Sequence, residues 1–193
     1  MTLNSNVSID ELSSQSKVTM IWVDQNIGEA GTHLALKQKF QALSSLIKKW
    51  HYFVSSDDFE SYLIENQMKN IICIMSGSIS RQLVPKYSHS NKIHSIYVFC
   101  FDVELAKRSL ANETKIAGIL DLEEELYGNI ADGLAKLFTN QGIESFDADN
   151  RVLARIYYQE AKRLLNTQAN YLNSYDKMKR LKEIDDRLEQ LFA

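Results

Sequence analysis

Proline and glycine are scarce in this sequence, which has one proline and seven glycines among its 193 residues. So few residues that break regular elements indicate dense secondary structure with short connections, and any disorder is expected only at the ends. Residues 1–16, which are polar and rich in serine and asparagine, are expected to form a disordered leader. They lack the basic segment and apolar run of a secretory signal.

Cysteine is nearly as rare as proline, with two residues, and long hydrophobic runs are missing altogether. Cys73 and Cys100 each lie inside a short apolar run, where a thiol usually packs as a small hydrophobic side chain. The longest of these runs, 71–75 and 96–101, reach about a third of the length that a membrane-spanning helix needs. We therefore expect a cytoplasmic protein in a reducing compartment, with no membrane association.

An excess of basic charge is also missing, because 22 basic residues stand against 25 acidic ones and the net charge is −3. This balance argues against a nucleic-acid partner, which would require a basic face. The two cysteines lie too far apart for a Cys-x-x-Cys unit, and the four histidines show no metal-ligand spacing. No metal and no cofactor is expected.

Short apolar runs alternate with longer amphipathic segments from residue 18 onward. This alternation is typical of βα units around a parallel sheet. The pattern predicts strands over 18–24, 52–54, 70–75, 95–101 and 115–120, with helices over 34–47, 55–68, 76–84, 102–110 and 122–138. Pro85 is expected to disturb or end the helix that begins near residue 76. Five such units favour an α/β fold with a flavodoxin-like (receiver-like), doubly wound parallel five-stranded sheet of order 2-1-3-4-5.

A predicted loop over 139–142 separates this sheet domain, residues 17–142, from a helical extension, residues 143–193. The extension is predicted to be one long helix or a helical hairpin, since its apolar residues recur at helical spacing. Four of them keep the spacing of a short heptad seam: Leu181, Ile184, Leu188 and Leu191. We expect this stripe either to dock on the rest of the chain or to bind a protein partner or a second copy.

Polar residues follow three of the predicted strands. In open α/β sheets, ligands bind at the carboxyl ends of the strands, where the strand order reverses. The candidate ligand-binding residues at these ends are Asp24, Ser76, Gly77, Ser78, Arg81 and Asp102. This set would receive a small polar or anionic ligand, or an acidic side chain of a protein partner. The alternatives are that Asp24 merely caps a loop and that 76–78 form an ordinary tight turn with hydroxyl caps.

The same positions exclude the phosphotransfer chemistry of receiver domains. Such a domain would carry a phosphorylatable aspartate where this chain has Met75 and Ser76, and a lysine where it has Leu120 and Asp121. Asp102 stands where a serine or threonine is expected. The sequence therefore predicts a receiver-like scaffold without a phosphoacceptor.

Cys100 stands near the end of the fourth strand, where caspase-like folds keep their nucleophile. The catalytic histidine of those folds is missing before Gly77, and a buried core cysteine is favoured. An enzyme remains the alternative, either a thiol hydrolase using Cys100 or an activity on a nucleotide-like anion near Ser76 and Arg81. The second alternative, an activity on a nucleotide-like anion, lacks motif support, because the chain has neither a Walker A lysine nor a G-x-G-x-x-G pattern.

Three stretches carry a resemblance to a known family: IWVD (21–24), ICIMSG (72–77) with RQLVP (81–85), and SIYVFCFD (95–102). Together they resemble the N-terminal receiver-like module of uncharacterised multidomain eukaryotic proteins that also carry tetratricopeptide repeats or an arginine ADP-ribosyltransferase domain. The likeness covers about residues 18–140. It implies an accessory or sensing module and assigns no catalytic residue. We therefore predict a non-enzymatic interaction or regulatory module.

Overall fold

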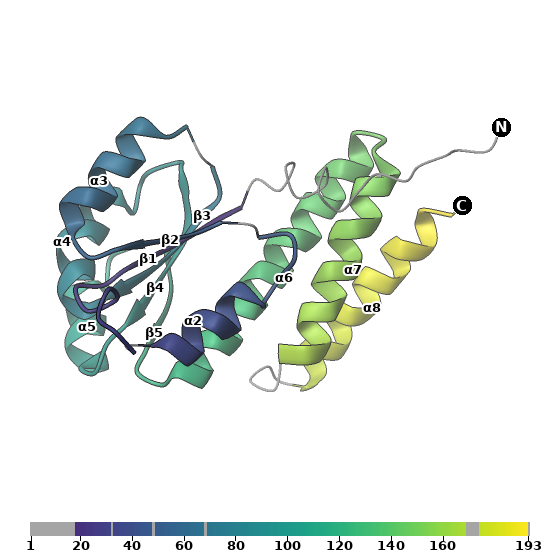
Figure 1. Ribbon diagram of the computed structural model, residues 1–193. Coiled ribbons are helices and arrows are strands. Elements are labelled where there is room, and N and C mark those ends of the chain that lie inside the picture. Colours follow the sequence, from purple (N-terminus) through teal and green to yellow (C-terminus); the bar gives the residue numbers. More distant parts are fainter. Residues whose placement is uncertain (1–17, 32, 48, 68, 169–173, 193) are drawn as a thin grey trace. The chain divides into compact units, whose positions relative to one another are not determined.

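The structure is a computed structural model that describes residues 18–31, 33–47, 49–67, 69–168 and 174–192 (Figure 1). The predicted leader, residues 1–16, lies outside the described residues. The chain divides into two compact units, residues 1–121 and 122–193.

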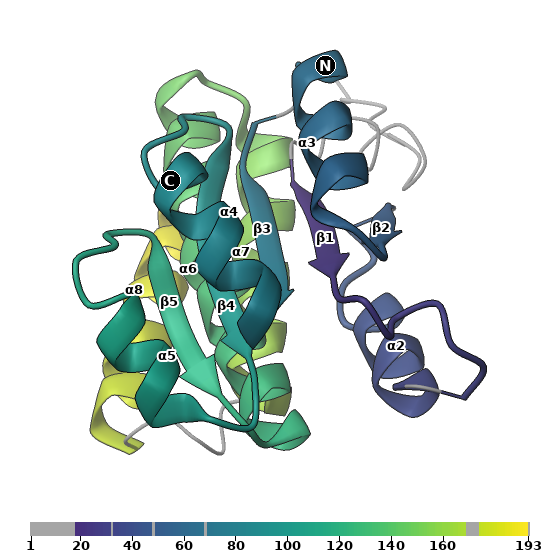
Figure 2. The same cartoon turned by 90° about the vertical axis from the view of Figure 1, so that its left-hand side faces the viewer.

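The first unit is built on a five-stranded sheet with the order β2-β1-β3-β4-β5. Every neighbouring pair of strands is parallel, and the arrowheads in Figure 2 accordingly point the same way. This topology confirms the predicted doubly wound α/β fold. The strands are β1 (Thr19–Val23), β2 (Trp50–Phe53), β3 (Ile71–Ser76), β4 (Ile93–Phe99) and β5 (Ile116–Leu120).

A hydrophobic core forms on one face of the sheet. Alternate residues of the central strands point to this face, including Cys73 of β3, which is fully buried as expected from its apolar run. Figure 2 shows helices α3, α4 and α5 on this side of the sheet. Their apolar residues complete the core: Phe59, Leu63, Ile79, Leu83, Val84, Ala106 and Leu110.

Four helices connect the strands: α2 (Leu34–Gln41), α3 (Ser56–Glu65), α4 (Gly77–Tyr87) and α5 (Val103–Ser109). The α3 helix begins as its sequence predicts, with the Ser55 hydroxyl accepting a hydrogen bond from the Asp58 N–H at 3.2 Å. The α2 helix is shorter than predicted and ends at Gln41. Leu43, Leu46 and Ile47 are nevertheless buried, in the turns that follow.

Pro85 lies inside α4, so of its two predicted effects, disturbing or ending this helix, the second is wrong. The helix continues to Tyr87, and the Ser88 N–H still donates to the Val84 carbonyl at 2.8 Å. Proline lacks an N–H and cannot bond to the carbonyl four residues earlier. Because Pro85 occupies the last turn, only that one helical hydrogen bond is lost.

The second unit consists of three helices in the described part of the chain, α6 (Glu123–Asp147), α7 (Arg151–Gln168) and α8 (Ser174–Gln190) (Figure 1). The α6 helix runs through residues 139–142, so the loop predicted there is wrong. Gly142 lies inside the helix, and a Cβ atom at this position would lie 2.4 Å from Cε1 of Tyr158 in α7. The glycine therefore permits close packing of α6 on α7.

The α8 helix packs antiparallel to α7, as in the predicted hairpin. Lys162 of α7 forms an ion pair with Asp185 of α8, and Arg151 at the start of α7 donates to the Leu191 carbonyl at 3.3 Å. Arg180 of α8 also bonds to Asp132 of α6. None of the described helices combines the length and the apolar character needed to cross a bilayer.

The apolar stripe of α8 is used mainly within the protein. Ile184 and Leu191 are buried, whereas Leu181 and Leu188 are partly exposed. The first two side chains cannot reach a partner while α8 stays packed. The burial of Ile184 and Leu191 agrees with the first of the two expected uses of the stripe, docking on the rest of the chain.

Candidate functional site

A cleft of about 340 Å³ lies at the carboxyl edge of the sheet in the first unit. The loops that follow β1, β3 and β4 form its walls. The residues that line it include all six predicted ligand-binding residues, together with Cys100, Phe101 and Leu105. The structure therefore brings the predicted set together at the predicted edge.

Asp24 follows β1 and is 8% exposed. Its N–H donates to the Phe53 carbonyl at 3.0 Å, which ties this position to β2. Its Oδ1 atom accepts a hydrogen bond from the Asn26 N–H at 2.9 Å, in an Asx turn. Asp24 thus caps its loop and also lines the cleft. No described basic group lies within ion-pairing distance of its carboxylate.

The hydroxyl groups at the start of α4 are arranged differently from a capped turn. Ser76 is the N-cap residue, yet its side chain makes no capping hydrogen bond. Its Oγ lies 3.5 Å from Oγ of Ser78, and both residues line the cleft. The expected hydroxyl cap at Ser76 is therefore absent, and the two hydroxyls border the cleft instead.

Gly77 permits a close approach between two walls of the cleft. A Cβ atom on this residue would lie 2.8 Å from Cβ of Cys100, closer than real Cβ atoms come. The start of α4 can therefore lie against the segment that follows β4 only because residue 77 has no side chain. Gly77 shapes the cleft and offers no side chain of its own to a ligand.

Arg81 lies one turn further along α4, is exposed, and lines the cleft. The position of a Cβ atom on Gly77 would be 3.8 Å from Nη1 of Arg81, which places the guanidinium at the cleft wall. The guanidinium makes no ion pair or hydrogen bond with any side chain in the described ranges. It is the cation of the cleft lining.

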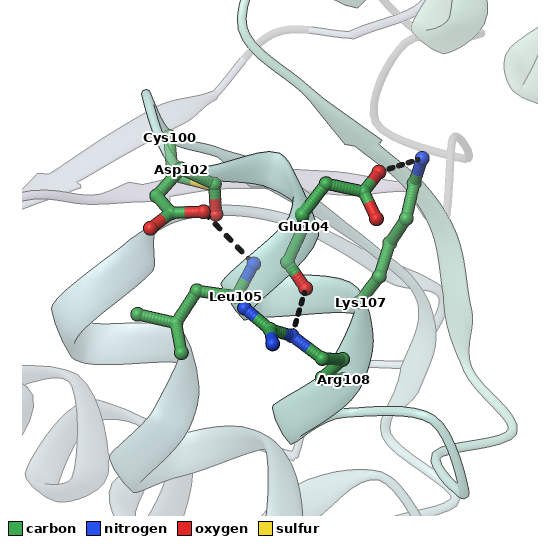
Figure 3. A network of polar contacts seen from close by, with 6 residues as sticks. All are labelled: Cys100, Asp102, Glu104, Leu105, Lys107 and Arg108. Atoms are coloured by element: carbon green, nitrogen blue, oxygen red, sulfur yellow. Dashed lines mark hydrogen bonds and ion pairs between the residues drawn. The ribbon is translucent and has the colours of Figure 1, made fainter.

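Asp102 caps the next helix. Its Oδ1 atom accepts a hydrogen bond from the Leu105 N–H at 2.9 Å at the start of α5 (Figure 3). Further along α5, Glu104 pairs with Lys107 at 3.0 Å and Arg108 donates to the Glu104 carbonyl at 3.3 Å (Figure 3). One Asp102 oxygen therefore has a structural task, although the residue borders the cleft.

Cys100 is not the buried core residue that its apolar run suggested. The β4 strand ends at Phe99, so Cys100 lies just beyond the strand, partly exposed and in contact with the cleft. Burial and the negative charges of Asp102 and Asp121 raise the pKa of its thiol, and the positive charge of Arg81 partly offsets this rise. The thiol is thereby held in its less reactive, protonated form.

Phe101 is a cleft residue that the sequence analysis missed, because it was assigned to the fourth strand. Its side chain is 99% exposed, and Leu105, also on the cleft lining, is 40% exposed. The helix-capping signal of Asp102 could have revealed this position. A capping residue must leave the strand before its helix begins, which places Phe101 in the connection.

No histidine is among the cleft-lining residues, all of which belong to the described ranges. Within those ranges, no group of three or more histidine, cysteine, aspartate or glutamate side chains is arranged to hold a metal ion. Comparisons with protein-family models, with curated proteins and with solved structures found no match.

Proposed function

We propose that the α/β unit is a non-enzymatic binding module whose receptor site is the carboxyl-edge cleft. One observation carries this proposal: three neighbouring strand ends bring a buried aspartate, a guanidinium with no partner among the described side chains and an exposed phenylalanine to one cleft, at Asp24, Arg81 and Phe101. Clefts of this kind, with a few convergent polar groups, are typical ligand sites in α/β proteins.

The chemistry of the cleft favours binding over catalysis. A receiver-type reaction has no acceptor carboxylate, because Ser76 ends β3. A thiol hydrolase would need a base beside Cys100 and a lowered thiol pKa, whereas the pKa is raised and the cleft lining has no histidine. The sensing or accessory role implied by the family resemblance agrees with a module that binds without turnover.

The proposal is tested by screening the full chain against a library of free amino acids, nucleotides, sugar phosphates and organic acids. Thermal shift detects binding, and equilibrium dialysis with mass spectrometry confirms it. The matched variants are Ser78→Trp, which fills the cleft, and Ser109→Trp, which places the same side chain at the exposed end of α5 outside the cleft lining.

We expect at least one compound class to stabilise the wild type and Ser109→Trp but not Ser78→Trp. The proposal fails if no class binds, or if every compound that binds does so equally in both variants. If the protein converts a compound to a product, the protein is an enzyme and the non-enzymatic proposal is wrong.

A further inference from the structure

We infer that the cleft binds a free aromatic α-amino acid, an inference that rests on the proposed function and names the ligand class. The zwitterion supplies three groups that the cleft can match. Its ammonium group would pair with Asp24, its carboxylate with Arg81, and its ring would pack on Phe101.

The surroundings of Asp24 favour a cationic hydrogen-bond donor on the ligand. Asp24 as a whole is only 8% exposed and lines the cleft, and a carboxylate with little access to water favours contact with a donor or a cation. Its described hydrogen bond, from the Asn26 N–H, engages Oδ1. No described lysine, arginine or histidine pairs with it. An ammonium group, with three donors and a positive charge, supplies both needs.

Arg81 calls for an anion. Its planar guanidinium matches the two oxygens of a carboxylate, and among the described side chains it has no such partner. Arg81 is carried by the helix that follows β3, and β3 is the hydrogen-bonded neighbour of β1, which carries Asp24. The two charged groups of an amino acid, separated by one carbon atom, therefore meet complementary charges on adjacent walls of the cleft.

The charge of the lining decides between a zwitterion and a phosphate. Asp24 and Asp102 stand against Arg81 in the lining, and Asp121 adds a further negative charge that acts on Cys100. A phosphate dianion would be drawn to Arg81 but repelled by these carboxylates. An amino acid has no net charge, and each of its charged groups faces the opposite sign. The lining therefore favours the amino acid.

Phe101 calls for an apolar, planar side chain on the ligand. A phenylalanine that is 99% exposed is unusual for a folded protein, and its position on the cleft beside the 40% exposed Leu105 gives a ligand ring a surface to pack on. Adjacent strands lie about 4.8 Å apart, so the ends of β1 and β4 are separated by about 10 Å, a span suited to an amino acid held between Asp24 and Phe101. The volume of about 340 Å³ falls in the range of small-molecule pockets.

Isothermal titration calorimetry of the full chain with a set of matched ligands tests the inference. L-Phenylalanine has all three groups, N-acetyl-L-phenylalanine lacks the ammonium, phenethylamine lacks the carboxylate and L-alanine lacks the ring. We expect L-phenylalanine to bind and each of the other three to bind at least about tenfold more weakly.

Three variants assign each ligand group to its residue. Asp24→Asn keeps an oxygen for the Asx turn and should abolish the preference for L-phenylalanine over its N-acetyl form. Arg81→Gln should abolish the preference over phenethylamine, and Phe101→Ala the preference over L-alanine. Arg108→Ala and Phe192→Ala, an exposed arginine of α5 and an exposed phenylalanine outside the cleft lining, serve as matched controls and should keep every preference.

The outcomes separate this inference from the proposed function. If L-phenylalanine does not bind, or if a nucleotide or sugar phosphate of the library binds more tightly, while some compound still distinguishes Ser78→Trp from Ser109→Trp, the inference is wrong and the binding module stands. If the variants unfold no earlier than the wild type yet leave every preference intact, the assigned residues are wrong. If no compound binds at all, both proposals fail.

Discussion

At the scale of single residues, Gly142 shows how one absent side chain fixes the packing of two helices. A Cβ atom there would lie 2.4, 2.6 and 3.0 Å from three ring atoms of Tyr158. Gly142→Ala gains about 1 kcal/mol of helix propensity but overpacks the α6–α7 contact at a cost of about 1–3 kcal/mol. We expect the free energy of unfolding, measured by urea denaturation, to fall.

The same contact provides its own control. In a Tyr158→Leu background the ring that obstructs the new methyl group is gone, so Gly142→Ala should then be neutral or stabilising. An equal loss of stability in both backgrounds would show that the cost does not come from Tyr158.

We expect His51 to make the stability of the protein depend on pH. Burial, and secondly the positive charge of Lys49, lowers the pKa of His51 below its ordinary value of 6.5. Its Nε2 atom lies 3.0 Å from the Tyr62 hydroxyl. Because the folded state resists protonation, the contribution of His51 is fully present above pH 6.5 and decreases as the pH falls below that value.

The measurement compares the free energy of unfolding at pH 7.5 and pH 5 for the wild type and His51→Gln. His94, whose pKa is also lowered by burial and by Lys115, contributes to the acid loss in both proteins. We therefore expect the variant to lose less stability than the wild type on acidification. An identical loss would contradict the assignment to His51.

Cys100 is expected to react slowly with iodoacetamide in the folded protein at neutral pH. Burial and two nearby carboxylates raise its pKa, and Arg81 works in the opposite direction. Arg81→Gln should consequently slow alkylation further, with Arg108→Gln as the control. Cys100→Ser reports on Cys73, which is fully buried and should stay unmodified until the protein unfolds. Faster labelling of Cys100 in Arg81→Gln would contradict this electrostatic account.

At the scale of elements, hydrophobic periodicity located both ends of every strand of the sheet to within two residues. The fourth strand was predicted over 95–101 but spans Ile93–Phe99, because Asp102 must leave the strand to cap α5. The glycine at 142 and the proline at 85 were interpreted as helix breakers. Whether such a residue ends its helix depends on the side chain packed against it and on its distance from the helix end, and the local sequence specifies neither.

The docking of α8 leads to a further prediction. Ile184 is 2% exposed, so Ile184→Ala should lower the free energy of unfolding by about 2–5 kcal/mol through the cavity that it creates. Met178 on the same helix is 66% exposed, and Met178→Ala should change stability little. Equal and small effects of the two substitutions in urea denaturation would mean that α8 does not dock through its apolar stripe.

At the scale of the whole molecule, the α/β topology and the meeting of the candidate residues at one sheet edge followed from the order of strands and helices. The division of the chain into two units did not follow from this order. The segment after Leu122 continues the alternation of strands and helices and was assigned to the sheet domain, whereas the contacts place it with α7 and α8. Which neighbour a helix packs on is a long-range property that its own periodicity does not contain.

The exposed Phe101 and the partly exposed Cys100 illustrate the same limit at the cleft. Both were assigned to a buried strand, since an apolar run looks alike whether it is covered or lies past the end of the sheet. The charged and polar residues of the cleft were predictable because the carboxyl ends of parallel strands converge. The position of the apolar Phe101 at the cleft was not predictable in this way.

The central claim is that the carboxyl-edge cleft is the binding site of this protein, and an NMR titration tests it most directly. Backbone amide resonances of the ¹⁵N-labelled full chain are followed while L-phenylalanine is added. The account predicts saturable shifts confined mainly to the segments around Asp24, Ser78, Arg81 and Phe101, which Ser78→Trp removes and Ser109→Trp retains. The absence of shifts at millimolar L-phenylalanine would contradict the inferred ligand class, and saturable shifts that map to another part of the chain would contradict the central claim.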